Sequence, residues 1–278
     1  MNLNFLQSLL IGFVSGLTEM LPISAEAHRT ILLTLFGVEQ EDAVFRLLVH
    51  IATLIALYAC FQNEVHALRR TSAQMRIPPK RRRKPLDPAS AGTVRLLRSA
   101  TVIMIILRVL SNTLSRNMEK LPLVTLGLFV TGFLLFIPRV VRSGNMDSRN
   151  MPRINGLLMG FGGGIGGVAG FSPLGCAMSL GHWQGVDRQY AMNFGYLLMI
   201  PGLILQTVTD LGAIIGGGAA AFSFTGLLIA IAGASVSAAG VVLGVNLMRK
   251  LVKNAGFTGF AYYCWGAALV CFILFLSI

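Results

Sequence analysis

Charged residues are scarce in this chain, and long stretches have none. Only 12% of the 278 residues are charged, while 54% are hydrophobic; soluble domains have roughly 25% charged residues. No Asp, Glu, Lys or Arg occurs between Leu211 and Met248, or between Phe257 and Ile278. A helix of about 20 mostly apolar residues crosses a bilayer, so each stretch is long enough to hold one. The composition argues against a soluble domain and predicts an all-α integral membrane protein.

Acidic residues are few compared with basic ones. The chain has 11 Asp and Glu against 23 Lys and Arg, which gives a net charge of +12. The basic excess is concentrated in segments 69–98, 139–153 and 249–253. Basic patches bind nucleic acid in some proteins, but between apolar spans they are typical of loops retained in the cytoplasm. We therefore expect no nucleic-acid partner, and cytoplasmic loops that also attract anionic lipid headgroups.

Cysteine is rare as well. The four cysteines are Cys60, Cys176, Cys264 and Cys271, and no two of them have CxxC spacing. This spacing predicts neither a cysteine metal site nor a disulfide framework. Because all four lie in or beside apolar segments, we expect buried thiols without a chemical role.

Six segments have the apolar character of full transmembrane helices, namely residues 44–62, 99–112, 121–138, 190–209, 223–246 and 257–277. Two further apolar segments, 5–38 and 154–186, are interrupted by Gly, Pro and polar residues. Non-helical backbone at membrane depth survives only where protein or a water-filled cavity surrounds it. We therefore expect each interrupted segment to form a re-entrant helix pair.

The two interrupted segments resemble one another. Gly12 aligns with Gly160 and Ser24 with Ser172, and each interrupted segment is followed by three of the expected spans. The pattern predicts two structural repeats.

The expected repeats are residues 1–138, which include a basic cytoplasmic loop at 63–98, and residues 139–278. Placing the basic segments in the cytoplasm gives the two repeats opposite orientations and puts both termini outside. Inverted repeats of this kind hold their substrate near the bilayer midplane, where the ends of broken helices meet.

Ionisable side chains crowd the break in the first interrupted segment. Glu19, Glu26, His28 and Arg29 lie close together on either side of Pro22 and its neighbours. Ionisable groups inside a membrane are costly and are candidates for a functional site by default. Two alternatives stay open: Glu19 pairs with His28 or Arg29 to satisfy the break, or Glu26 and Arg29 extend to the outer interface.

Ser24 lies just after the proline, where a new helix can begin and free backbone N–H groups can bind an anion. Four positions separate Ser24 from His28, so the two suit a nucleophile and its base on one helix face. His50 falls in the middle of span 44–62 and faces either a central cavity or a neighbouring helix.

The second interrupted segment is rich in glycine and leads to Gly170, Phe171 and Ser172. A glycine-rich turn before a helix allows the backbone to approach a phosphate closely. The alternative is that the glycines serve close helix packing.

The residues quoted so far resemble the undecaprenyl-pyrophosphate phosphatase family, the bacitracin-resistance membrane phosphatases. Residues 15–28 read SGLTEMLPISAEAH, where the family motif has the form EGLTEFLPVSSTGH. Residues 169–175 read AGFSPLG, where the second motif has the form PGFSRSG. Stretches 185–188 and 197–201 also match the family in order and spacing. The resemblance covers nearly the whole chain and implies inverted repeats with re-entrant pairs.

The resemblance implies an enzyme that removes one phosphate from a polyprenyl diphosphate, in the recycling of the lipid carrier for peptidoglycan synthesis. The implied location is the bacterial cytoplasmic membrane, the implied cofactor is Mg²⁺ or Ca²⁺, and a homodimer is one option for the assembly. By position, Glu19, Ser24 and His28 are the expected catalytic residues, with Glu19 also a metal ligand. The expected substrate-binding residues are Glu26, Arg29, His50, Gly170 and Ser172.

Four positions of the family motifs that would carry the chemistry hold other residues here. Ser15 stands at the first acid, Ala25 at the second serine, Pro173 at the arginine and Leu174 at the serine that follows it. An arginine can contribute roughly 10³–10⁵ to the rate of phosphoryl transfer, and Arg29 and Arg188 are the candidates to replace it. Three functions therefore stay open: a phosphatase, a transporter or flippase that moves polyprenyl phosphate without hydrolysis, and a lipid-binding pseudoenzyme.

Overall fold

The computed structural model describes residues 3–38, 41–82, 85–115, 120–141, 144–217, 223–254 and 257–277. Basic residues 83, 84 and 142 lie outside these ranges. The described residues form helices α1 (Phe5–Glu19), α2 (Ala25–Leu35), α3 (Ala43–Cys60), α4 (Gln62–Met75), a short 3₁₀ helix η1 (Pro79–Arg81), α5 (Pro88–Ser115), α6 (Lys120–Val140), α7 (Arg153–Ile165), α8 (Pro173–Trp183), α9 (Arg188–Gly216), α10 (Phe224–Asn254) and α11 (Gly259–Ser277).

Five of these helices, α3, α6, α9, α10 and α11, are long and apolar enough to cross a membrane. The chain is therefore a multi-pass, all-α integral membrane protein. The five helices coincide with five of the six expected spans. The sixth, 99–112, lies inside α5, which is not among the five. All four cysteines are free thiols.

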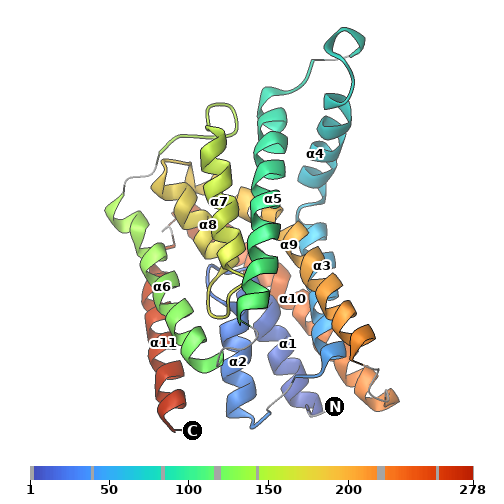
Figure 1. Cartoon of the computed structure of the whole chain (residues 1–278), viewed down its shortest axis with the longest axis vertical. Coiled ribbons are helices and arrows are strands. Elements are labelled where there is room, and N and C mark those ends of the chain that lie inside the picture. Colours follow the sequence, from blue (N-terminus) through green and yellow to red (C-terminus); the bar gives the residue numbers. More distant parts are fainter. Residues whose placement is uncertain are drawn as a thin grey trace.

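The basic segment 63–98, expected as a loop, is largely helical. It contains most of α4, the η1 turn and the first third of α5. Helix α4 has a polar sequence, and Phe61 is the one residue that separates it from α3. In Figure 1, α4 and the adjoining part of α5 extend beyond the other helices, at the end of the molecule away from both termini.

The two interrupted segments form the expected broken helix pairs, and they enter the molecule from opposite ends (Figure 1). Helices α1 and α2 form one pair, and α7 and α8 the other. Each second helix is capped by a serine: Ala27 N donates to Ser24 Oγ at 3.2 Å, and Gly175 N donates to Ser172 Oγ at 3.0 Å. The two breaks meet, since a Cβ on Gly175 would lie 2.7 Å from the Pro22 carbonyl oxygen.

Glycines allow the first helix of each pair to pack closely on a neighbour. A Cβ added to Gly12 would lie 2.1 Å from Gly233 O on α10, and one added to Gly160 would lie 2.4 Å from Ala100 O on α5. These two glycines are the ones that the internal alignment pairs. Their matching contacts support the inverted repeat, which we put forward as a proposal.

Replacing either glycine with alanine is expected to destabilise the protein by about 1–3 kcal/mol, because the new methyl group overlaps backbone that cannot move aside. Gly212→Ala is the matched control. Gly212 is also helical, but nothing lies within 4 Å of an added Cβ, so this change is expected to be neutral or stabilising. Thermal unfolding in detergent measures the effect. A Gly12→Ala protein that unfolds at the wild-type temperature would contradict the packing described.

Candidate functional site

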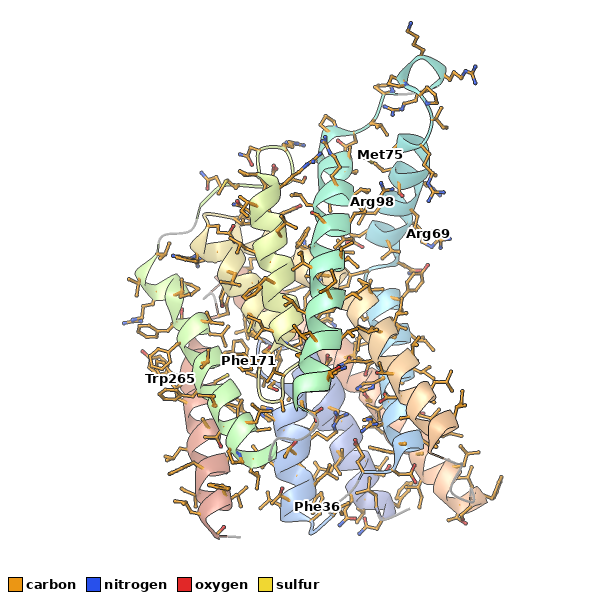
Figure 2. The ribbon with its side chains drawn as sticks, viewed as in Figure 1. Phe36, Arg69, Met75, Arg98, Phe171 and Trp265 are labelled. Atoms are coloured by element: carbon orange, nitrogen blue, oxygen red, sulfur yellow. The ribbon has the colours of Figure 1, made fainter. Side chains whose placement is uncertain are left out.

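A small cavity lies where the two helix breaks meet. Figure 2 shows Phe171, which lines this cavity, at about mid-height between Phe36 at the end of α2 and Met75 on α4. The cavity is lined by Ser15, Glu19, Ala25, Glu26, Arg29, Val49, His50, Thr53, Gly166, Phe171, Pro173 and Gln206. Ala25 and Pro173 are the first residues of α2 and α8, so two helix N-termini, each with partial positive charge, open on this space. Its volume is about 30 Å³, enough for one or two water molecules.

Glu19 is the acid of this cavity that has no partner. It is the last residue of α1, is half-buried, and makes no hydrogen bond or ion pair with any residue that the structure describes. The pairing with His28 or Arg29 that the sequence left open is therefore not observed. Ser15, one helical turn earlier, has a buried Oγ that likewise lacks a partner among the described residues. The two side chains offer oxygen atoms to a ligand.

Arg29 is buried and bound by carboxylates on two sides. Its guanidinium forms an ion pair with Glu26, and its Nε lies 3.5 Å from Glu41 Oε2. Arg29 does not extend to the membrane surface, because only 8% of it is exposed. Two carboxylates therefore offset the one positive charge that Arg29 contributes to the cavity wall.

His28 and Ser24 are neighbours, but not as a nucleophile and its base. His28 Nδ1 lies 2.6 Å from the Ser24 carbonyl oxygen, so Nδ1–H donates to the backbone. Its Nε2 lies 2.6 Å from the Tyr263 hydroxyl, and the two rings stack at 5.5 Å. His28 thus faces α11 and is not among the residues that line the cavity, while Ser24 Oγ caps α2.

His50 both lines the cavity and binds a neighbouring helix. Its Nδ1–H donates to Asp210 Oδ2 at 2.5 Å, and Arg46 Nε donates to Asp210 Oδ1 at 2.8 Å. Asp210 lies on α9, so these bonds join α3 to α9 beside the cavity. The sequence analysis missed Asp210 and Arg46. The signal was present: Arg46 and His50 are one turn apart in an expected span, and Asp210 directly follows another.

Arg108 is the second cation that the sequence analysis missed. It is 2% exposed, and its Nε donates to Gly163 O at 3.2 Å. Its Nη1 is buried with no partner among the described residues. The guanidinium lies against α9, because a Cβ on Gly202 would be 3.3 Å from Arg108 Cζ. One turn later, Gln206 lines the cavity with a buried Oε1 that also lacks a described partner.

Arg108 is therefore a better candidate than Arg188 for the missing motif arginine. Arg188 is the first residue of α9 and does not line the cavity. Arg108 lies just behind the α7 and α9 parts of the cavity wall, and its charge interacts with that of Glu19. Sequence spacing gave no indication of this, since Arg108 is far from both motifs along the chain.

Gly170 and Ser172 shape the second break rather than line the cavity. Gly170 has φ +88°, and a Cβ there would lie 2.4 Å from Val124 O on α6, so only glycine fits this turn. Ser172 N donates to Thr131 Oγ1 at 3.3 Å, which also fixes the turn on α6. Glycines of α7 pack against α5, which favours helix packing as their role.

The residues that the structure describes include no group of three or more His, Cys, Asp or Glu side chains that could hold a metal ion. The oxygen donors without partners around the cavity are Glu19, Ser15 Oγ and Gln206 Oε1. Hard cations such as Mg²⁺ prefer oxygen, and Mg²⁺ is commonly held by one or two carboxylates together with substrate phosphates. The donor set therefore suits such an ion only when a ligand supplies further oxygen atoms.

Asp210→Asn is expected to destabilise the protein by about 3–5 kcal/mol, because removing one partner of a buried charge cluster leaves the others unpaired. In a double-mutant cycle, Asp210→Ala and His50→Ala are expected to couple by about 0.5–3 kcal/mol. Thermal unfolding in detergent gives both values. The exposed Glu64 provides the control variant Glu64→Gln, which should be near neutral. Additive effects of the two alanine changes would contradict a direct bond between α3 and α9.

The model of the family described as bacitracin resistance protein BacA matches residues 8–270. A protein of Shouchella clausii named undecaprenyl-diphosphatase 1 is 29% identical over 274 residues, covering 98% of this chain and 96% of the relative. Undecaprenyl-diphosphatases of Methanobrevibacter smithii and Treponema denticola are 28% and 25% identical, covering 98% and 94% of this chain and the same shares of the relatives. The chain therefore belongs to the BacA family.

Proposed function

We propose that the cavity binds the diphosphate group of a polyprenyl carrier lipid, and that the protein acts in recycling this carrier for cell-envelope synthesis. The observation that supports this most is the meeting of two helix N-termini at membrane depth, beside Arg29 and Arg108. Free N–H groups at helix N-termini bind phosphate. A polyprenyl tail would remain in the surrounding bilayer, which explains why the anion site lies so deep in the molecule.

The charges around the cavity favour an anion with several oxygen atoms. Arg29 is balanced by two carboxylates, whereas Arg108 has no ion-pair partner among the described residues. A buried guanidinium with an unused donor gains strongly from a phosphate oxygen, because charge-assisted bonds are about twice as strong as neutral ones. We propose Arg108 as the cation that a bound diphosphate attracts.

A diphosphate does not fit into a space of about 30 Å³. Binding therefore requires the cavity to open, and the ion pair between Glu26 and Arg29 is the contact that must separate, since both side chains form its wall. Opening of one repeat relative to the other is the motion that inverted repeats support.

The names of the relatives favour hydrolysis, in which the protein would release the terminal phosphate and leave a polyprenyl monophosphate. Glu19 lines the cavity and has no hydrogen-bond or ion-pair partner among the described residues, so one oxygen of its carboxylate would accept a proton from the attacking water. Its other oxygen, together with the lipid phosphates, would hold Mg²⁺ or Ca²⁺, which would supply charge neutralisation. Arg108 and the N-termini of α2 and α8 would hold the diphosphate in place.

A second candidate is a transporter or flippase that moves the polyprenyl phosphate without hydrolysis, or a protein that only binds it. The position of His28 favours this candidate. Both of its ring nitrogens are bound, to the Ser24 backbone and to Tyr263, and neither contacts Ser24 Oγ. Pro173 also leaves the second motif without a cation.

We further propose the cytoplasmic membrane as the location, with the α4 end of the molecule in the cytoplasm. This end carries the basic helix α4 and the η1 turn, and basic segments are retained inside. The start of α1 and the end of α11 both lie at the other end of the molecule (Figure 1), which would place both termini outside.

Purified protein with Mg²⁺ is expected to release phosphate from undecaprenyl diphosphate if the first candidate is correct. Glu19→Ala should then lower the rate at least about 10²-fold, the typical contribution of a general base. Glu64→Ala, at an exposed acid of α4, should not change it. Folded protein that binds the lipid but releases no phosphate would instead support the second candidate, and vesicle assays of lipid movement would follow.

Arg108→Gln is expected to weaken diphosphate binding about 10- to 100-fold, since a hydrogen bond to a charged group contributes roughly 1.5–3 kcal/mol. Arg108→Lys keeps the charge and should recover part of the affinity. The control is Arg95→Gln, at an exposed arginine of the same helix. Titration calorimetry or lipid-dependent thermal stabilisation measures the affinity, and unfolding without lipid verifies the fold. Wild-type affinity in folded Arg108→Gln would exclude Arg108 from the site.

A further inference from the structure

A second and larger hollow lies on the outside of the helix bundle, between α4, α5 and α9. Its volume is about 720 Å³, within the roughly 300–1,000 Å³ typical of ligand sites. None of its lining residues lines the cavity between the helix breaks. The groove is therefore a separate feature of the surface, and its role does not depend on the function proposed above.

The rim of the groove is basic and its floor is apolar. Its charged residues are Arg69 from α4, Arg76 directly after α4 and Arg98 from α5, and none of the described residues that line it is acidic. Arg98 is held in position, because its Nη2 donates to Ser72 Oγ at 2.7 Å. The floor is built from aliphatic side chains of α5 and α9, including Leu97 and Ile200.

The groove lies where the apolar, membrane-crossing part of the molecule meets its charged end. Its α9 wall belongs to a membrane-crossing helix, whereas α4 is too polar to cross a bilayer. Figure 2 shows Arg69 and Arg98 on the adjoining parts of α4 and α5, in the half of the molecule away from Phe36. Among the described residues α4 packs mainly on α5, with a smaller contact to α3, and the hollow separates α4 from α9.

We propose that this groove binds one anionic phospholipid of the surrounding bilayer. The phosphate contacts Arg69 and Arg98, and an acyl chain lies along Leu97 and Ile200. The charge of the rim matches a phosphate, and the apolar floor continues directly into the lipid phase. A phospholipid fits better than the carrier lipid, because the groove offers no acid or other reactive group and has no connection to Glu19.

Native mass spectrometry of the full chain in detergent tests the proposal, with phosphatidylglycerol as the anionic probe and phosphatidylcholine of the same acyl chains as the zwitterionic one. The wild type is expected to retain phosphatidylglycerol preferentially. Arg69→Gln with Arg98→Gln should weaken its binding on the order of tenfold, since each arginine near an anionic headgroup contributes about fivefold.

The matched control is Arg70→Gln with Arg95→Gln, which removes the same charge from the same two helices at exposed positions outside the groove. It should bind phosphatidylglycerol like the wild type. A second pair of variants tests the floor: Ala73→Trp fills the groove and should weaken binding, whereas Ala67→Trp on the exposed side of α4 should not. Circular dichroism during heating verifies that all four proteins fold.

Equal effects of the two arginine pairs would overturn the proposal, because bulk charge would then explain the binding. Equal retention of the two phospholipids would overturn it as well. Displacement of phosphatidylglycerol by millimolar inorganic phosphate, or by equimolar polyprenyl monophosphate, would assign the groove to free phosphate or to the carrier lipid instead. Diphosphate binding at the cavity should stay unchanged in Arg69→Gln with Arg98→Gln, so failure of one proposal is distinguishable from failure of the other.

Discussion

The structure depends on satisfying broken backbone in the interior of an apolar helix bundle. Two helix pairs break and restart there, which frees N–H and carbonyl groups that apolar side chains cannot bind. Ser24 and Ser172 cap the restarted helices, and Gly175 allows one break to touch the other at Pro22. The first residues of the two restarted helices, Ala25 and Pro173, line a common cavity. The arrangement that makes two interruptions tolerable therefore also forms the cavity that we propose as an anion site.

The buried polar and charged groups around this cavity fall into two classes, which differ in whether they bind one another. Asp210 joins Arg46 and His50, and Glu26 with Glu41 surrounds Arg29, so these groups largely satisfy one another. Such clusters stabilise helix positions only as long as every partner is present. Glu19, Ser15, Gln206 and Arg108 keep atoms without hydrogen-bond partners among the residues that the structure describes. These atoms are available to a ligand, which makes them the more informative residues for function.

Membership of the BacA family and the local geometry point to the same lipid chemistry but not to the same mechanism. The motif positions of Glu19, Ser24 and His28 are retained, yet His28 binds Tyr263 and Ser24 serves as a cap. Pro173 replaces a cation, while Arg108 approaches the same region from another helix. A protein can thus keep an anion site while exchanging the side chains that surround it, because affinity for phosphate depends on where charge lies and not on which helix supplies it.

The sequence by itself determined the membrane class, five of the spans and the breaks in the two interrupted segments. Each of these follows from local hydrophobicity or local backbone chemistry, which neighbouring residues encode. It also singled out Glu19, Glu26, Arg29 and His50, which the structure brings together around one cavity. Only the tertiary structure decided that His28 turns toward α11, that Gly170 and Ser172 support the turn, and that Asp210 and Arg108 join the site. Those outcomes depend on contacts between helices far apart in the chain, and spacing along the sequence carries no record of such contacts.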